Sequence, residues 1–419
     1  MTLRDLEHVR PSEILAKLRP GSERRIHATY SRRKTWPKMI AWNPARELTF
    51  RCIDPAWRAK LRRFVAEQRR CRRFIVGFFS YDLGLHRLGI RPRDRAAPGL
   101  PDGYLAAFGN YLSGADGGLR TVAEDRKFLA EVEAILRRPA APVPPGPVFD
   151  RPFRSRIGRA EYRRAFRTIQ RHIRAGDVYQ LNLTHRLEGR TGLDPLAVFR
   201  RVRDASPRSL LALIEGEDHA VISASPERFV RIADGAIMTA PIKGTRPRGR
   251  TAAEDRRLRS ELLSSEKERA ELNMITDLLR NDLGTVCRPG SVKVTARRKL
   301  TAHPTIWHTH SEIAGRLLPG LDPLDALVDL LPGGSISGCP KRRALEIIDR
   351  LEPVPRGVYT GTLVTIDPAG TLDASIVIRT LLQRGRHAYL SVGGGIVHGA
   401  TESAEYQESL DKAKVFTEL

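Results

Sequence analysis

The sequence predicts an α+β fold. Short apolar segments separated by turn residues predict strand-rich hairpins, and longer segments with apolar residues at helical spacing lie between them. The two kinds of segment do not alternate regularly, which disfavours a doubly wound parallel sheet. With 419 residues, 41% of them hydrophobic, the chain is long enough to bury the core of one large or two ordinary domains.

The N-terminal third has apolar segments and segments with helical character. Residues 74–83 and 104–111 are expected to form buried strands, because apolar and aromatic side chains run through them. Helices are expected at residues 11–18 and, from residue propensities, at 121–138. This region therefore combines both kinds of element.

A proline-rich segment follows at residues 138–147. Its composition excludes a helix or a central strand. We place a boundary there, between an N-terminal region (1–145) that packs against the core and the core itself (150–419). The alternative is a loop across the surface of one domain.

A helix and a strand are expected next. Apolar residues recur at helical spacing from residue 162 to 173, and Gly176 is a suitable terminator. In the strand at residues 177–184, alternation places the polar Gln180 and Asn182 on the face opposite the apolar side chains.

The second half continues this irregular mixture. Two strands bracket a Ser-Pro-Glu-Arg-Phe segment that contains Glu227, and a short strand at residues 236–239 leads to a loop around Lys243. One long helix is expected at residues 253–282. The remaining expected elements are a helix that ends at residue 351, strands at 358–366, 375–381 and 388–392, and a last helix at 402–416.

The glycine-rich segment at residues 331–341 matches a phosphate-binding loop only in part. Gly333 and Gly338 have the required spacing, but Cys339 and Pro340 occupy the positions of the Lys and the Ser or Thr. We therefore expect a turn at a helix N-terminus, with capping favoured over anion binding as its role.

The composition is strongly basic. A formal net charge of +24 would attract polyanions or anionic small molecules. Nucleic-acid binding is disfavoured, because the arginine excess is spread along the chain without a zinc-finger spacing, an aromatic RNA-binding motif or a basic tail. A non-catalytic polyanion-binding scaffold is the remote alternative.

Four cysteines without any Cys-X-X-Cys pair suit a reducing compartment and argue against a disulfide framework or a structural zinc site. The N-terminus has no apolar core, and no apolar segment is long enough to span a bilayer. We therefore expect a cytoplasmic protein that does not associate with membranes.

Lys243 is the first candidate functional residue. It lies in the segment Ala-Pro-Ile-Lys-Gly-Thr, where Gly244 lets the backbone approach a ligand closely. The chain has 60 Arg and only 12 Lys, and an amine can become a nucleophile whereas a guanidinium cannot. The alternative is an ordinary lysine in a surface turn.

Acidic residues and histidines supply further candidates. Glu271 and Glu408, on separate expected helices, suit Mg²⁺, although Glu408 could instead form a surface pair with Lys412. His303, His308 and His310 match no zinc signature, so one histidine acting as a hydrogen-bond donor is favoured. Glu227 is either a buried general acid or an ion-pair partner of Arg228.

Nine segments, taken together and in order, resemble the chorismate-utilising family, which includes anthranilate, aminodeoxychorismate, isochorismate and salicylate synthases. The segments are GDVYQLNLTHR, SPERF, PIKGT, ERAELNMITDLLRNDLG, the Trp307-His308 segment, PGGSISGCPKRRALEIIDRLEP, RGVYTG, IVIRT and GGGIVHGATESAEYQESLDKA. The resemblance implies a large mixed sandwich of antiparallel sheets flanked by helices, with a chorismate-binding catalytic core at residues 150–419.

The resemblance also implies roles for individual residues. It implies Mg²⁺ bound through Glu271 and Glu408, with Lys412 in the site rather than in a surface pair. Chorismate is a dianion, which suits cations, helix ends and a glycine nest. The implied substrate-binding residues are Gln180, Gly244, Thr245, His308, Tyr359, Arg379, Gly393, Gly394, Gly395 and Lys412.

Two positions distinguish branches of this family. Isochorismate and salicylate synthases carry a water-activating lysine where this chain has Gln180, so hydration at C2 is not expected. Anthranilate synthases typically have alanine where this chain has Lys243, whereas aminodeoxychorismate synthases read Pro-Ile-Lys-Gly-Thr. The resemblance thus favours the aminodeoxychorismate branch, with anthranilate synthase component I as the alternative.

The implied reaction is nucleophilic. Lys243 attacks C2 of chorismate while the C4 hydroxyl leaves with Glu227 as general acid, and ammonia then attacks C4 and expels the lysine. Arg246 and Arg248 are candidates for lowering the pKa of Lys243. Since no Cys-His-Glu glutaminase is found, a separate glutamine amidotransferase subunit is implied as the source of ammonia. Departures from the family pattern at Cys339, His310, Gly399 and Ala400 touch no assigned metal ligand.

Overall fold

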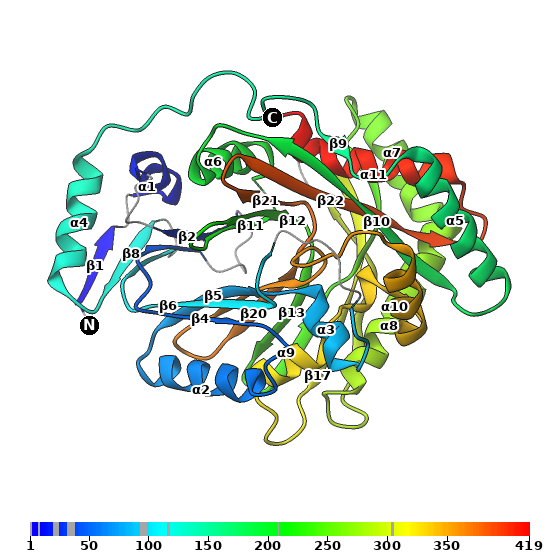
Figure 1. The fold of residues 1–419 in the computed structure, drawn as a ribbon, viewed down its shortest axis with the longest axis horizontal. Helices are drawn as coiled ribbons and strands as arrows, with labels where there is room; N and C mark the ends of the chain where they lie inside the picture. Colours follow the sequence, from blue (N-terminus) through cyan, green and yellow to red (C-terminus); the bar gives the residue numbers. More distant parts are fainter. Residues whose placement is uncertain are drawn as a thin grey trace.

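The computed structural model describes residues 2–6, 9–19, 25–31, 38–92, 99–114, 118–207, 209–302 and 306–419. Two antiparallel sheets face each other, with helices on their outer sides (Figure 1). The expected α+β fold of antiparallel sheets flanked by helices is therefore confirmed.

The first sheet has 12 strands within the described residues. Its order is β1 (Thr2–Leu6), β8 (Leu119–Ala123), β7 (Tyr111–Gly114), β3 (Met39–Trp42), β2 (Ile26–Tyr30), β11 (Leu210–Glu215), β12 (Ala220–Ser225), β21 (Thr380–Arg384), β22 (His387–Val397), β10 (Gln180–Arg190) and β18 (Gly338–Cys339), with β9 (Arg154–Ser155) beside β10.

The second sheet has 10 strands in the described part of the chain. Its order is β15 (Ile242–Pro247), β17 (Ile306–Arg316), β14 (Ala236–Thr239), β13 (Arg228–Ala233), β20 (Leu372–Ile376), β19 (Thr362–Ile366), β5 (Phe74–Phe79), β6 (Gly103–Phe108) and β4 (Arg46–Phe50), with β16 (Lys293–Ala302) beside β17.

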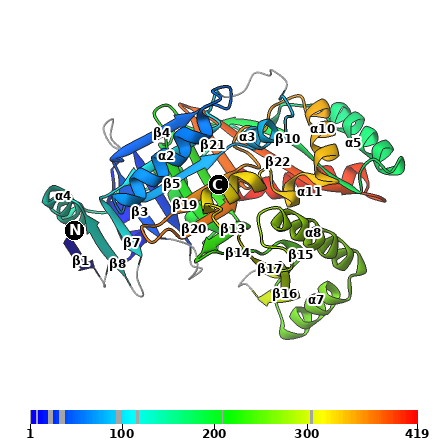
Figure 2. The same cartoon turned by 90° about the horizontal axis from the view of Figure 1, so that it is seen from below.

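The helices cover the outer faces and the ends of the sheets. They are α1 (Pro11–Lys17), α2 (Trp57–Arg70), α3 (Tyr81–Arg87), α4 (Arg126–Arg137), α5 (Arg159–Arg174), α6 (Pro195–Ala205), α7 (Ala252–Ser264), α8 (Glu266–Gly284), α9 (Pro323–Leu330), the short 3₁₀ helix η1 (Gly334–Ile336), α10 (Lys341–Leu351) and α11 (Glu402–Thr417). In Figure 2, α7 and α8 lie at the end of the molecule opposite α4 and β1. No helix among the described residues is long and apolar enough to cross a membrane.

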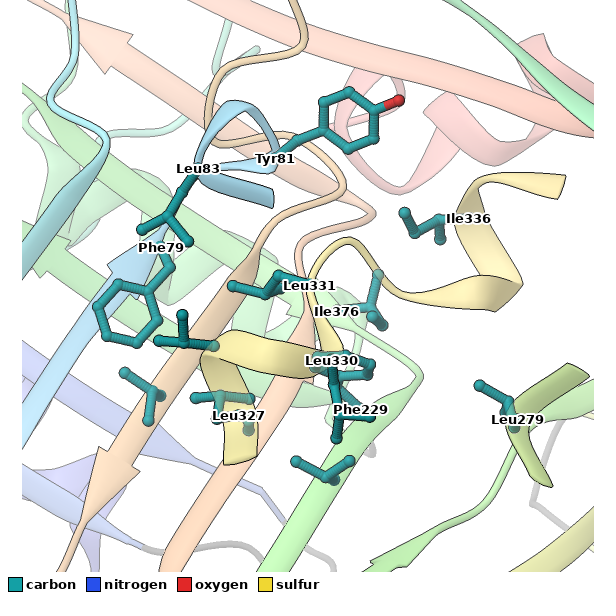
Figure 3. Packing of buried hydrophobic residues seen from close by; sticks show 14 of the residues in the cluster. Phe79, Tyr81, Leu83, Phe229, Leu279, Leu327, Leu330, Leu331, Ile336 and Ile376 are labelled. Atoms are coloured by element: carbon teal, nitrogen blue, oxygen red, sulfur yellow. The ribbon is translucent and has the colours of Figure 1, made fainter. Parts of the chain in front are cut away.

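Alternating side chains of the strands fill the space on both sides of each sheet. On β5, Phe74, Val76 and Phe78 belong to the core between the sheets, whereas Ile75 and Phe79 belong to the core beneath the helices. Figure 3 shows Phe79 in this second core with the labelled side chains of α9, η1 and β20. The unbroken apolar sequence of β5 therefore reflects burial on both faces.

Residues on the two sides of the proline-rich connector share both sheets. Strand β2 pairs with β11 in the first sheet, and β5 pairs with β19 in the second. The connector itself contains neither helix nor strand, as expected from its prolines. The N-terminal strands are thus structural members of the same sandwich that holds the later residues.

Several predicted boundaries in the N-terminal third were wrong because polar caps end or begin helices there. The strand expected at residues 74–83 ends at Phe79, since the Ser80 hydroxyl accepts a 3.1 Å hydrogen bond from the Leu83 N–H and starts α3. The helix expected from residue 121 begins only after Asp125, which caps Phe128 in the same way. The segment 104–111 is divided between β6 and β7.

The prediction of one long helix at residues 253–282 was also wrong. Two helices occupy this segment, and Ser265 separates them with an extended backbone conformation. Its hydroxyl accepts a hydrogen bond from the Glu268 N–H and so begins α8 in a new direction.

Candidate active site

Lys243 lies beside a bulge in β15, where the pairing with β17 shifts between Lys243 and Thr245. Gly244 has a φ of 82°, a conformation that glycine adopts without the steric cost of a side chain. A Cβ atom at Gly244 would also lie 2.5 Å from Oε2 of Glu268. The bulge therefore requires glycine, and bulges commonly redirect the neighbouring side chain.

The Lys243 amine faces a carboxylate of α8. Its Nζ lies 4.0 Å from Oε2 of Glu271, and about a quarter of each side chain is exposed (26% and 24%). Arg246 and Arg248, which we expected to influence Lys243, form ion pairs with acidic side chains of α8 and α7. Lys243 is thus a partly buried amine at the edge of an acidic cluster.

Glu227 lies in the turn between β12 and β13. The Ser335 hydroxyl donates a 2.8 Å hydrogen bond to Oε1 of Glu227. Burial raises the pKa of Glu227, opposed by this hydrogen bond and by the charge of Lys243. A raised pKa keeps a carboxyl protonated closer to neutral pH, as a general acid requires. Arg228 instead pairs with Asp373 at 2.8 Å, so the ion-pair alternative for Glu227 was wrong.

Helix α11 carries a second group of charged residues. Lys412 Nζ lies 2.8 Å from Oε1 of Glu408 and donates a 3.0 Å hydrogen bond to the Gly393 carbonyl. Glu405, one turn earlier, is buried, and its pKa is raised by burial and by the charges of Glu408 and Glu271. The carboxylates of α8 and α11 therefore lie close enough to repel one another.

The prediction of a glycine nest at residues 393–395 was wrong. These glycines lie within β22 and pair with β10, and none of them has a positive φ. Their function follows from the missing side chains: a Cβ at Gly394 would lie 3.3 Å from Oε2 of Glu405, and one at Gly395 would lie 2.6 Å from Nε2 of Gln180. The glycines thus leave room on both faces of a continuous strand.

Polar side chains connect the strand face of Gln180 to Glu227. Gln180 Nε2 donates a 3.2 Å hydrogen bond to Asn182, and Asn182 Nδ2 donates one of 3.2 Å to the Ser335 carbonyl. Ser335 in turn holds Glu227. Gln180 is buried, and its Oε1 has no hydrogen-bond donor within the described residues, so the side chain joins this network through its Nε2.

Tyr359 and Arg379 lie in adjoining turns. The Thr360 N–H donates to the Val377 carbonyl, which connects the two turns. Arg379 has a φ of 48°, and burial lowers the pKa of its guanidinium. No hydrogen bond or ion pair engages this guanidinium within the described residues. A partly buried guanidinium without a hydrogen bond or ion pair is suited to binding an anionic ligand.

His308 is buried on β17, opposite Thr245 of β15. Its ring centroid lies 5.7 Å from that of His310, whereas His303 falls outside the described residues. Among the residues that the structure describes, no group of three or more His, Cys, Asp or Glu side chains is arranged to hold a metal ion. Glu271 and Glu408 can still suit Mg²⁺, which usually takes one or two carboxylates and completes its shell with water and substrate.

Comparison with known proteins identifies the family. The family described as chorismate binding enzyme matches residues 25–418. The chain belongs to this family. Arg379 and Lys412, the two cations that we expected at the substrate, are both partly buried.

Relatives within the family carry different names. The chain is 39% identical to "Aminodeoxychorismate synthase component 1" of Klebsiella aerogenes, over 80% of this chain and 75% of the relative. It is 36% identical to "Anthranilate synthase component 1" of Pseudomonas putida, over 81% and 73%. The crystal structure of anthranilate synthase component I from Streptococcus pneumoniae matches with a TM-score of 0.79 and 29% identity, over 92% of this chain and 93% of that chain.

Three residues that lie beside the candidate site residues were not predicted from the sequence. Glu405 and Glu268 lie three residues before Glu408 and Glu271, so each expected helix already carried a second carboxylate on a neighbouring position of the same face. Ser335 gave no such signal, because its contact with Glu227 joins segments about a hundred residues apart. Its place in the site depends on the tertiary fold.

Proposed function

We propose that this protein is an aminodeoxychorismate synthase component I. It converts chorismate and ammonia to 4-amino-4-deoxychorismate, for 4-aminobenzoate and folate biosynthesis. The observation that carries the proposal is the position of the Lys243 amine, 4.0 Å from Glu271 and close enough to Glu227 to influence its pKa. A nucleophile from strand β15 and a general acid from the turn between β12 and β13 thereby lie close together.

The proposed reaction divides one substitution into two displacements. The neutral Lys243 amine forms a bond to C2 of chorismate, the two conjugated ring double bonds shift, and the C4 hydroxyl leaves as water with a proton from Glu227. Ammonia then forms a bond to C4, both double bonds shift back, and the Lys243 amine leaves from C2. Glu227 recovers a proton from the attacking nitrogen.

Magnesium is part of the proposal. Glu271 and Glu408 would hold Mg²⁺, and Glu405 would support them from the buried side of α11. The donor set fits, since it offers hard carboxylate oxygens. Burial has the largest effect in raising the pKa of Glu405, and the negative charges of Glu408 and Glu271 add to it, so a cation would also relieve some repulsion. Bound Mg²⁺ would neutralise the ring carboxylate of the substrate and polarise it.

The other groups would bind and orient the dianion. Arg379 and Lys412 supply the cations, and Tyr359, Thr245 and His308 supply hydrogen-bonding groups at the surrounding turns and strands. Ammonia would come from glutamine through a separate amidotransferase subunit. The phrase "component 1" in the names of the relatives supports this two-subunit arrangement.

Anthranilate synthase component I is the second candidate. Relatives with that name reach identities similar to those of the aminodeoxychorismate synthases. The two activities use the same substrate and differ in the carbon that receives nitrogen. Lys243 separates them, because direct amination at C2 needs no enzyme nucleophile at that carbon.

Product analysis tests the proposal. The purified protein would be incubated with chorismate, Mg²⁺ and ammonium at alkaline pH, together with Lys243→Ala and Lys267→Ala. Lys267 is the matched control, since its Nζ also lies 4.0 Å from Glu271 but its side chain is 71% exposed. We expect aminodeoxychorismate from the wild type and Lys267→Ala, and a loss of at least about 100-fold in Lys243→Ala. Anthranilate from the wild type with an unimpaired Lys243→Ala would instead establish the second candidate.

A further inference from the structure

The glycine-rich segment before α10 presents a hydroxyl to the acid. Ser335 lies in η1, and its Oγ donates a 2.8 Å hydrogen bond to Oε1 of Glu227. This is the sole side-chain hydrogen bond to that carboxyl group among the described residues. The segment that resembled a phosphate-binding loop thus contacts a carboxyl group of the protein itself.

A buried ion pair supports η1 from one side. Lys341, the first residue of α10, lies 2.6 Å from Oδ1 of Asp282 at the end of α8. A Cβ atom on Gly334 would lie 2.9 Å from Oδ2 of Asp282, so the first residue of η1 packs directly on this pair. Both charged side chains are at least four-fifths buried, which restricts their movement.

Hydrogen bonds and apolar packing also hold η1. Arg356 Nη1 donates a 2.9 Å hydrogen bond to the Ile336 carbonyl, and Asn182 Nδ2 donates to the carbonyl of Ser335. The Ile336 side chain is 4% exposed and belongs to the apolar cluster of Figure 3. Ser335 is therefore held at its own backbone and through both of its neighbours.

This arrangement distinguishes the two oxygens of Glu227. Because the Ser335 O–H donates to Oε1, that oxygen acts as an acceptor, and the transferable proton of the acid is carried by Oε2. When Oε2 releases its proton, the bond from Ser335 becomes charge-assisted and stronger. The hydroxyl thus stabilises the carboxylate that forms as the leaving group departs.

We propose that Ser335 is a positioning residue for Glu227, fixing which carboxyl oxygen delivers the proton to the departing C4 hydroxyl. The inference rests on the proposed function. The proton moves from Oε2 to the hydroxyl oxygen, which leaves as water, and the C4–O bond electrons go with it. Ser335 keeps its own proton throughout.

The charged surroundings of Glu227 make the inference testable by pH. Lys243 of β15 is the cation that acts on this carboxyl group, while Arg228, the next residue in the chain, is paired with Asp373 of β20. Removing the Ser335 hydroxyl removes a donor that favours the charged form, so the pKa of Glu227 should rise. Activity that needs the protonated acid should then persist to higher pH.

The experiment compares pH–rate profiles of the wild type, Ser335→Ala, Ser335→Thr and Ser337→Ala, with chorismate, Mg²⁺ and ammonia. Ser337 is the matched control, since its hydroxyl bonds the carbonyls of Gly333 and Gly334 in the same segment. For Ser335→Ala we expect kcat to fall about 10- to 100-fold and the alkaline limb to move to higher pH. Ser335→Thr should restore both, and Ser337→Ala should leave the limb in place.

Three outcomes would contradict these proposals, and they distinguish a failure of the inference about Ser335 from a failure of the proposed function. An alkaline limb in Ser335→Ala that coincides with the wild-type limb overturns the positioning role, even if the rate falls. A wild type that makes no 4-amino-4-deoxychorismate overturns the proposed function instead. An equal shift of the limb in Ser337→Ala also contradicts the inference, because that residue does not touch Glu227.

Discussion

A buried ion pair beneath the site gives the sharpest stability prediction. Arg356 and Glu352 are 2% and 3% exposed and lie 2.8 Å apart. Arg356 also donates hydrogen bonds to Ile336, Asn182 and Thr360, so its guanidinium connects η1, β10 and the turn beside Tyr359. Glu352 accepts two further hydrogen bonds, each of 2.9 Å, from Thr184.

Glu352→Ala should remove the counter-charge and leave a buried cation. The guanidinium would lose two of its hydrogen bonds, and the Thr184 N–H would lose its acceptor. Breaking a buried pair in this way costs about 3–5 kcal/mol, much of it the penalty for the remaining unpaired charge. Glu352→Gln keeps the shape and one acceptor and should lose less.

Urea denaturation followed by circular dichroism measures this loss. The matched control is Glu261→Ala, which breaks the exposed pair of Arg257 and Glu261, where the side chains are 60% and 45% exposed. That change should cost less than about 0.5 kcal/mol. A loss below about 1 kcal/mol for Glu352→Ala would refute the reasoning, since it would mean that water or a rearrangement replaces the carboxylate.

Three more predictions follow from single contacts. Burial raises the pKa of Glu215 from 4.5 to about 7, so the folded state binds the proton more tightly than the unfolded state does. The free energy of unfolding should therefore fall by about 3 kcal/mol as pH rises from 4.5 to 7. Glu215→Gln should remove this pH dependence, as measured by denaturation curves at several pH values. Gly393→Ala would place a Cβ 2.4 Å from the Leu183 carbonyl and should lower the melting temperature by several degrees, whereas Gly394→Ala meets only side-chain atoms and should lower it less. Arg379→Met should raise KM for chorismate by about 10-fold or more with a smaller effect on kcat, and an unchanged KM in steady-state assays would exclude it from the substrate site.

Local sequence patterns were sufficient to predict several of the secondary-structure elements. The apolar segment of β5, the amphipathic α5 with Gly176 after it, and the proline-rich connector were recognised because each depends on neighbouring residues alone. The patterns failed where a single hydroxyl or carboxylate acts as a cap. Ser80, Asp125 and Ser265 each begin a helix at a point that helical propensity would not choose.

The glycine segment of β22 shows why conformation depends on pairing partners. Three consecutive glycines permit a nest as readily as a strand. Eleven backbone partners along β10 hold the whole of β22 in the extended form instead. The structure therefore gives these glycines another role than the predicted nest, because their missing side chains leave space beside Glu405 and Gln180.

The sequence by itself determined the fold class, the chemical types in the site and the candidate roles of Lys243, Glu227, Glu271 and Glu408. These depend on composition, local periodicity and ordered motifs, which are properties of short segments. Only the tertiary structure decided that Ser335 holds Glu227, that Glu405 adds a buried carboxylate, and that Arg379 has no counter-ion among the described residues. Such facts depend on distances between segments far apart in the chain, which are fixed only when two sheets and their helices pack together.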